Sequence, residues 1–274
     1  MNLESFPEDA DIERFTELVY RHFNYDFRNY ARASLRRRLA RAMLQFGFAR
    51  LAELEALLLE TPEAFGQVLQ YLTVQVSDMF RDPNFFRAFR EHVVPELGTY
   101  PSPRLWVAGC ATGEEVLSIA IVLREEGLLE RCLIYATDIS PEALRKAQLG
   151  VYALDRVAAF TENHQKTGAA CSLSAYYTAA YGGVAFDRSL TKRVVFSDHS
   201  LATDHVFAEV QVVLCRNVLI YFDKTLQARA LGLFTDALSR RGFLGLGSKE
   251  TLAFTGHAQA YRRVVPDEPW YRRC

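Results

Sequence analysis

Residues 109–115 combine small residues and acids in a pattern that can build a ligand site. Gly109, Ala111 and Gly113 stand at alternate positions, and small residues at this spacing let a backbone approach a ligand closely. Residues 104–108 before them have the composition of a buried parallel strand, and apolar residues at helical spacing follow. The run is therefore predicted to form a tight strand-to-helix turn, where open α/β sheets bind ligands.

Glu114 and Glu115 end this run and are predicted to begin the helix. A helix N-terminus attracts the pyrophosphate of a dinucleotide, but two carboxylates there would repel it. They favour a cationic group on the ligand, and S-adenosylmethionine carries an ammonium and a sulfonium but no phosphate. Each acid alone has an alternative interpretation as an ordinary first-turn residue that suits the helix dipole.

Asp138 follows the second predicted strand, residues 133–136, at the chain distance where an acid can chelate the two hydroxyls of a ribose. The alternative is that Asp138 caps the next helix. Ser140, directly before Pro141, fits that cap better. We therefore interpret Asp138 as a ribose ligand.

Composition limits the class of protein. The chain has 274 residues, is 50% hydrophobic and carries a net charge of -1, so it can bury a large core. Near-neutral charge disfavours a dedicated nucleic-acid binder, and no apolar run reaches the roughly 20 residues of a membrane span. The five scattered cysteines suggest reduced thiols. We expect a monomeric cytoplasmic enzyme that binds no metal, does not insert into membranes and has no nucleic-acid partner.

The periodicity changes along the chain and indicates separate parts. We expect an all-helical domain over residues 1–72, a linker with a connecting helix over 73–98, and an α/β domain over 99–274. Within the last part, residues from about 160 to 192 break the alternation of strands and helices. The Gly182-Gly183 turn in this stretch predicts a small β insertion, an element that often sets specificity.

Further strands of the α/β domain are expected at residues 193–196, 210–214 and 243–246, with a closing antiparallel pair at 261–265 and 270–273.

A basic helix is predicted in the first domain. Seven arginines and no acid lie between residues 28 and 50. Arg36, Arg37, Arg38 and Arg41 fall on a helix that has a separate apolar side, and a face of one sign suggests an acidic partner. The alternative is that these arginines balance acidic neighbours in the same domain.

The fourth strand, at residues 210–214, ends in a polar segment that contains Arg216, Asn217 and Tyr221, where a catalytic group is expected. With this segment the sequence resembles the chemotaxis receptor methyltransferases, the CheR family. Four blocks carry the resemblance, residues 76–83, 108–115, 136–139 and 215–223, and the basic helical segment resembles the family's N-terminal domain.

This resemblance implies a class I S-adenosylmethionine-dependent methyltransferase fold. That fold is an α/β, Rossmann-like, mostly parallel seven-stranded sheet, here with a small all-α N-terminal domain and a small β insertion. The implied reaction moves the methyl of S-adenosylmethionine to glutamate side chains of chemoreceptors and leaves S-adenosylhomocysteine.

By resemblance, Arg81 binds the methionine carboxylate of the cofactor, Glu114 or Glu115 its ammonium, and Asp138 its ribose. The remaining implied positions are Gln75 and Ser77 close to the cofactor, Ser200 and Leu201 near the adenine, Arg216 and Asn217 beside the methionine end, and Tyr221 near the transferred methyl.

The chain departs from the family pattern at Ser200, where the family prefers Asn, and at residues 247–250, which replace a Gly-His-Ser-Glu run. Serine lacks the paired donor and acceptor of an amide, so adenine recognition is expected to move to the backbone or to a neighbour such as Asp198.

The chemistry needs little from the protein beyond orientation. A glutamate with an ordinary pKa near 4.3 is ionised at neutral pH and requires no general base. Arg81 and Tyr221 are expected to act catalytically by holding carboxylates in place. The alternative for Tyr221 is a core aromatic.

The implied partners are the cytoplasmic helices of chemoreceptors, docked on the basic helix, and a receptor C-terminal peptide at the β insertion. Two alternatives stay open. One is a methyltransferase-like signalling adaptor that binds cofactor without methylating receptors, and the other is a methyltransferase for RNA or a small molecule.

Overall fold

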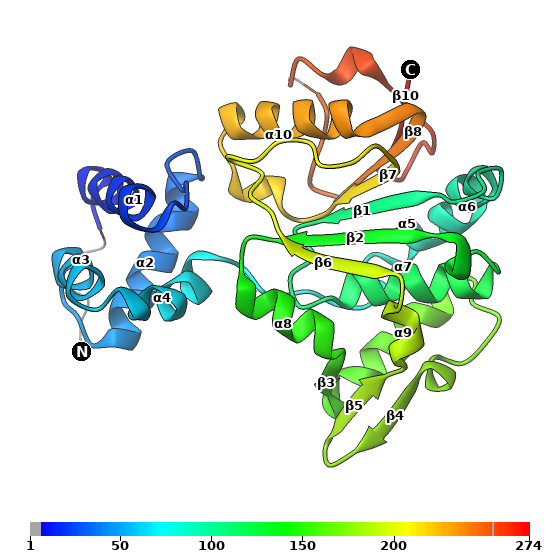
Figure 1. Ribbon diagram of the computed structural model, residues 1–274, viewed down its shortest axis with the longest axis horizontal. Coiled ribbons are helices and arrows are strands. Elements are labelled where there is room, and N and C mark those ends of the chain that lie inside the picture. The colour runs from blue at the N-terminus through cyan, green and yellow to red at the C-terminus, as the bar shows by residue number, and fades with distance from the viewer. Residues whose placement is uncertain (1–6, 254) are drawn as a thin grey trace.

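A computed structural model of the chain describes residues 7–253 and 255–274. A helical unit lies beside a larger α/β unit, and Figure 1 shows the extended connection between them. Residues 1–6, the start of the expected first domain, lie outside the described part. No helix in the described ranges is both long and apolar enough to cross a membrane, and no group of three or more potential metal ligands was found there.

Four helices form the N-terminal unit because each has one apolar side. They are α1 (Asp9–Phe23), α2 (Arg32–Phe46), α3 (Leu51–Glu60) and α4 (Phe65–Leu72). Ile12, Phe15 and Val19 of α1 are buried at helical spacing. Helix α2 ends at Gly47, whose left-handed φ of 75° favours glycine.

The connection to the second unit is irregular backbone followed by a bent helix. After residues 73–82 come α5 (Pro83–Ala88), a π-helical turn (Phe89–Val93) and α6 (Val94–Leu97). Pro83 occupies the first helical turn, where its missing N–H costs nothing.

The α/β unit is built on the expected seven-stranded sheet. Its strands are β1 (Arg104–Ala108), β2 (Leu133–Asp138), β6 (Val194–Asp198), β7 (Val210–Cys215), β8 (Leu238–Leu246), β9 (Tyr261–Arg263) and β10 (Trp270–Arg273). Their order is β6-β2-β1-β7-β8-β10-β9, and β10 is antiparallel to both of its neighbours. Strands β2 and β6 are added on one side of β1, and β7 and β8 on the other, so the strand order reverses between β1 and β7. The two strands are parallel, and their carboxyl ends leave a crevice at this point.

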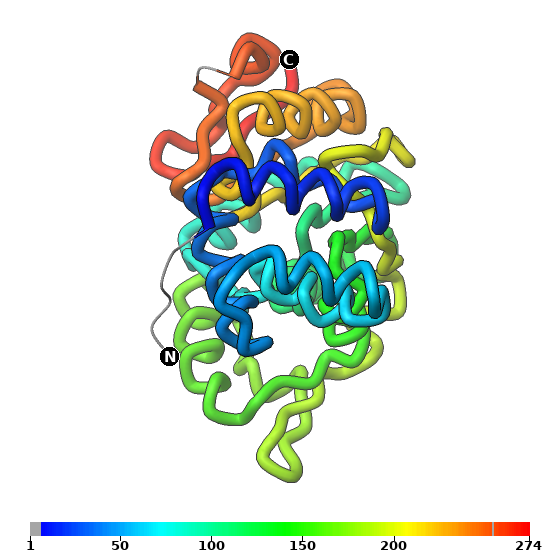
Figure 2. Tube along the Cα trace, turned by 90° about the vertical axis from the view of Figure 1, so that its left-hand side faces the viewer, coloured from blue at the N-terminus to red at the C-terminus, as the bar shows by residue number. Residues whose placement is uncertain are grey.

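Alternation along β1 separates two cores. Leu105 and Val107 face the core that includes α7 (Glu114–Glu125), whereas Trp106 and Ala108 face the core that includes α10 (Lys224–Ala237). The core on the α10 side continues into the helical unit. Figure 2 shows α1–α4 in front of the end of the sheet, so this unit covers the edge where the strands finish.

The β insertion begins earlier in the chain than the sequence predicted. It is a three-stranded antiparallel sheet of order β3-β5-β4, from β3 (Val151–Ala153), β5 (Gly183–Phe186) and β4 (Tyr177–Ala180). The expected start near residue 160 missed β3, because three residues between two helices are too short to show alternation. Helix α8 (Pro141–Leu149) precedes β3, and α9 (Val157–Lys166) follows it.

The expected hairpin is present, but its turn is one residue earlier. Tyr181 and Gly182 both have positive φ, as a two-residue hairpin turn requires, and Gly183 already belongs to β5.

Candidate active site

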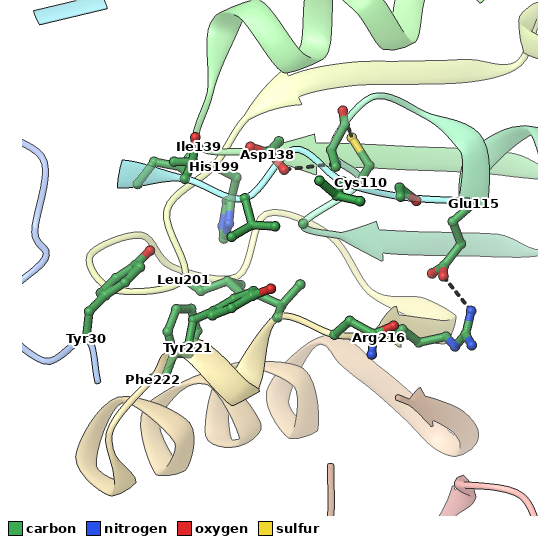
Figure 3. A pocket seen from close by; sticks show the side chains of 18 of the residues that line it. Tyr30, Cys110, Glu115, Asp138, Ile139, His199, Leu201, Arg216, Tyr221 and Phe222 are labelled. Carbon is green, nitrogen blue, oxygen red and sulfur yellow. Dashed lines mark hydrogen bonds and ion pairs between the residues drawn. The ribbon is translucent and has the colours of Figure 1, made fainter. Parts of the chain in front are cut away.

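One pocket lies at the carboxyl ends of β1, β2 and β7 and extends to the helical unit. It encloses about 970 Å³ when its open mouth is included. Figure 3 shows Asp138 and Tyr221 on opposite walls, with Glu115 and Arg216 at one end and Tyr30 at the other. Its lining includes many predicted residues, namely Ser77, Arg81, Gly109, Glu115, Asp138, Leu201, Arg216, Asn217 and Tyr221.

The turn after β1 owes its small residues partly to protein packing. A Cβ on Gly109 would lie 2.5 Å from the Cγ2 of Val218, and one on Gly113 would lie 2.8 Å from Ala147. Gly109 and Gly113 also have left-handed φ angles of 72° and 92°. The alternation of small residues therefore reflects close approach of other chain segments as well as room for a ligand.

Asp138 holds this turn and still faces the pocket. Its carboxylate accepts N–H bonds from Ala111 and Ser140, both at 2.9 Å. Burial raises the pKa of Asp138, and no cation in the described ranges pairs with it. Ser140 caps α8 by accepting from the N–H of Ala143, as expected. Asp138 is thus a partly buried acceptor with capacity for further donors.

The two acids at the start of α7 have different surroundings. Glu115 lines the pocket, and its Oε2 lies 2.8 Å from Nη1 of Arg216. Burial raises the pKa of Glu115, and Arg216 opposes that shift. Glu114 is 0% exposed, is not part of the lining and instead pairs with Arg156 at 2.7 Å. Of the two acids that the resemblance offers for the ammonium, Glu115 therefore lines the pocket and Glu114 does not.

Arg216 is fixed by more than Glu115. Its Nη2 donates to Asp82 and to the carbonyl of Arg81, both at 2.8 Å, and its guanidinium lies over the ring of Phe85. The guanidinium of Arg81, by contrast, lines the pocket without a hydrogen bond or ion pair to any described residue. Arg81 is therefore available to an anion in the pocket.

Two further predicted cofactor residues lie outside the lining. The amide of Gln75 donates to the hydroxyl of Ser140 at 3.1 Å. Ser200 stabilises its own turn, because its hydroxyl accepts from the N–H of Ala202 and its N–H donates to Asp204. Short polar side chains bond readily to nearby backbone, which explains the position of Ser200.

The basic helix does not present a face of one sign. Arg36 pairs with Asp9 of α1, and Arg32 pairs with Glu13. Arg38 is 8% exposed and lines the pocket. The remaining predicted docking residues, Arg37 and Arg41, are exposed. The alternative of acidic neighbours in the same domain therefore accounts for part of the cluster, which the sequence could not show because α1 and α2 meet only after folding.

Three residues in or beside the pocket were not predicted from the sequence. Tyr30 reaches the lining from the helical unit, and burial raises its pKa. His199 lines the pocket in place of the expected neighbour Asp198, and its buried Nδ1 has no partner in the described ranges. Glu250 lies outside the lining but accepts N–H bonds from Gly247, Asn217 and Val218 at 2.7 to 3.0 Å. Of these three residues, Glu250 lies in a segment that the sequence had marked, because residues 247–250 depart from the family pattern.

Comparison with protein families decides the class. The all-alpha domain of CheR methyltransferases matches residues 10–73, and the S-adenosylmethionine-binding domain of CheR methyltransferases matches residues 75–265. The chain belongs to the CheR methyltransferase family. These matches confirm the predicted family, fold and cofactor, so this CheR methyltransferase is an S-adenosylmethionine-dependent enzyme.

Relatives from several bacteria match nearly the whole chain. A Pseudomonas putida protein named Cher3 is 50% identical over 265 residues, 97% of each chain. The chemotaxis protein methyltransferase of Salmonella typhimurium is 30% identical over 269 residues, which cover 94% of this chain and 86% of that one. The chemotaxis protein methyltransferase of Escherichia coli K12 is 28% identical and covers 89% of this chain and 85% of its own.

The pocket of this CheR methyltransferase fits S-adenosylmethionine in charge and polarity. Asp138 is a partly buried acceptor without a cation, which suits a ribose diol, and Arg81 is a cation without a described partner, which suits a carboxylate. The unpartnered Nδ1 of His199 adds a further polar contact point. The lining therefore combines an acceptor, a cation and a further polar atom.

Proposed function

We propose that this CheR methyltransferase transfers a methyl group from S-adenosylmethionine to glutamate side-chain carboxylates of chemoreceptors and thereby serves chemotaxis. The observation that supports a carboxylate substrate is the presence of two arginines, Arg38 and Arg81, that line the pocket without an acidic partner in the described ranges. Cofactor and substrate together bring two carboxylates. Each arginine can therefore bind one of them.

Arg38 suits the substrate carboxylate because of its position. One guanidinium nitrogen donates to the carbonyl of Leu72, and the other, Nη2, is buried without a partner among the described residues. Burial lowers the pKa of Arg38, yet an arginine remains protonated at neutral pH. A carboxylate at Nη2 would satisfy both the charge and the unmade hydrogen bond.

The other proposed roles belong to residues that line the pocket. Arg81 binds the methionine carboxylate, Asp138 binds the ribose hydroxyls, and Glu115 binds the ammonium. The ion pair with Arg216 keeps the Glu115 carboxylate in place. Ser77, Gly109, Leu201 and Asn217 complete the cofactor site. Tyr221 donates a hydrogen bond to the substrate carboxylate and sets its angle of approach.

The cofactor supplies a methyl group on a sulfonium, which makes the methyl electrophilic. The glutamate oxygen forms the new C–O bond as the S–C bond breaks, so the opposite charges neutralise and no proton is released. Arg38 and Tyr221 hold the carboxylate in line, and the helical unit limits water at the mouth. Orientation of this kind supplies several kcal/mol in other enzymes, on the order of 7–11 at best.

Receptor docking is the remaining part of the proposal. Arg37 and Arg41 are exposed one helical turn apart on α2, beside the pocket-lining Arg38. Methylation segments of receptors carry glutamates on helices, which these two cations would attract. The β insertion is the candidate site for a receptor C-terminal peptide. An adaptor without methyltransferase activity is not favoured, because the chain belongs to a family of methyltransferases.

The deciding experiment is transfer of labelled methyl from S-adenosylmethionine to a chemoreceptor cytoplasmic fragment. Base treatment of a glutamate methyl ester releases volatile labelled methanol, whereas methylated nitrogen does not. The matched control is the same fragment with glutamine at its methylation sites. Base-stable label, or equal label on both fragments, would reject the glutamate proposal.

A further inference from the structure

Arg156 links the β insertion to two segments that carry pocket residues, without lining the pocket itself. It ends the short 3-10 turn Leu154–Arg156 that follows β3. Its Nη1 lies 2.7 Å from Glu114, and its Nη2 donates to the carbonyl of Ser77 and, at 2.9 Å, to Asp78. We propose that Arg156 is a positioning residue, which holds the Ser77 segment and the start of α7 at the separation that S-adenosylmethionine requires.

Each of the two segments that Arg156 contacts carries a residue of the pocket lining. Ser77 itself lines the pocket, and Glu115, which follows Glu114, also lines it. A second contact supports the same turn, because the hydroxyl of Tyr152 in β3 donates to the carbonyl of Thr112 at 2.7 Å. The root of the insertion is therefore joined to the cofactor turn by two side chains.

The Ser77 segment needs such support because it has no regular structure. Residues 74–78 are extended backbone between α4 and α5, so few backbone bonds hold them. The planar guanidinium can bond Glu114 and the Ser77 carbonyl at the same time, in a fixed geometry that a lysine cannot reproduce. Segments ordered before binding lose less entropy when a ligand arrives, and affinity rises accordingly.

Arg156 also neutralises a buried charge, so two roles must be separated. Glu114 is 0% exposed, and Arg156 is its ion-pair partner. Removing Arg156 alone leaves a buried carboxylate without a counter-charge, which lowers stability whatever the effect on the cofactor. The effect of Arg156 on cofactor binding can be measured apart from its effect on stability in a Glu114→Gln variant, where the buried charge is absent.

The experiment measures binding of S-adenosylhomocysteine by calorimetry and thermal unfolding of the ligand-free protein. The variants are Arg156→Met, Arg156→Lys, Glu114→Gln and the double variant Arg156→Met with Glu114→Gln. Arg124→Met is the matched control, because Arg124 also joins α7 to the insertion, 3.8 Å from Asp187, but away from the pocket. Binding of this product does not depend on the proposed receptor substrate.

We expect the double variant to bind S-adenosylhomocysteine more weakly than Glu114→Gln, by a factor on the order of ten, as when a residue that orients ligand-binding groups is lost. Its melting temperature should exceed that of Arg156→Met. Arg156→Lys should lose less affinity than Arg156→Met, and Arg124→Met should bind as the wild type does.

Equal affinity of the double variant and Glu114→Gln, within about twofold, would overturn the proposal. Arg156 would then serve only to neutralise Glu114. Because this comparison uses two proteins without the buried charge, it remains decisive even if Arg156→Met does not fold.

Discussion

The guanidinium of Arg38 lies over the ring of Tyr221, with its central carbon 4.4 Å from the ring centroid. Arg38 belongs to α2 of the helical unit, and Tyr221 follows β7 of the α/β unit. The contact is reinforced by the N–H of Ala31, which donates to the carbonyl of Tyr221 at 2.8 Å, and by edge packing of Tyr30 on Phe222. The helical unit therefore contributes to the lining of the candidate active site and is also a candidate docking surface.

Tyr221→Phe should lower the turnover number about tenfold to a hundredfold, the usual loss when one hydrogen bond to a charged group is removed. The affinity for S-adenosylhomocysteine should stay within about twofold, because the ring still packs under Arg38. Steady-state kinetics and calorimetry give the two values. Equal losses in both would assign Tyr221 to cofactor binding instead.

Arg38→Met should reduce kcat/KM for a receptor fragment about tenfold or more at any salt concentration, because a buried charge-assisted hydrogen bond is little screened. Arg37→Met is the matched control on the same helix, and its smaller effect should fade as salt rises. Methyl transfer at two ionic strengths separates them. If both variants respond to salt in the same way, Arg38 does not act inside the pocket.

Charge reversal at Arg37 and Arg41 should raise KM for an intact receptor at low salt and have little effect near 1 M salt, where the Debye length is about 3 Å. The control is reversal at the exposed Arg240 and Arg262, which changes the net charge equally on strands β8 and β9. A salt-independent wild-type rate, or the same response from both reversals, would argue against docking on α2.

Asp138→Asn should weaken binding of S-adenosylhomocysteine. In the ligand-free protein, the stability of the variant relative to the wild type should increase as pH rises. Burial raises the pKa of Asp138 above its ordinary value, so this group stabilises the fold most at pH values below that ordinary value. Its contribution is lost as pH increases through the raised pKa. Urea unfolding from pH 4 to pH 7 should show the stability of the variant gaining on that of the wild type. A constant difference would contradict this.

Gly247→Ala should strongly reduce cofactor binding, because a Cβ there would lie 2.7 Å from Oε2 of Glu250 and 2.9 Å from the backbone nitrogen of Asn217. The clash would separate Glu250 from the N–H groups that fix the turn at Asn217. Gly66→Ala in α4 is the control, since its Cβ would meet nothing within 4 Å and should stabilise the helix by about 0.5–1 kcal/mol. Wild-type binding by Gly247→Ala would show that the Glu250 contacts are dispensable.

The strands and the location of the pocket were predictable because they depend on local patterns. Residues 104–108 and 133–136 are apolar runs of strand length, and a ligand crevice follows from parallel order alone. Strand β3 was missed because its three residues carry no periodicity. The sequence did not show that Ser200 and Gln75 lie outside the pocket lining, because a resemblance specifies positions in a motif and not the hydrogen bonds that short polar groups make with their own neighbours.

The sequence by itself determined the family, the fold and the acids and arginines that the site uses, since these are carried by residue types at fixed spacing. Only the tertiary structure decided which of them share the cavity. It turned Glu114 towards Arg156 and Glu115 towards the pocket, and it paired Arg36 with α1 while burying Arg38 beside Tyr221. Helical rotation separates adjacent side chains by about 100°, and packing between distant segments then selects the partner of each charge.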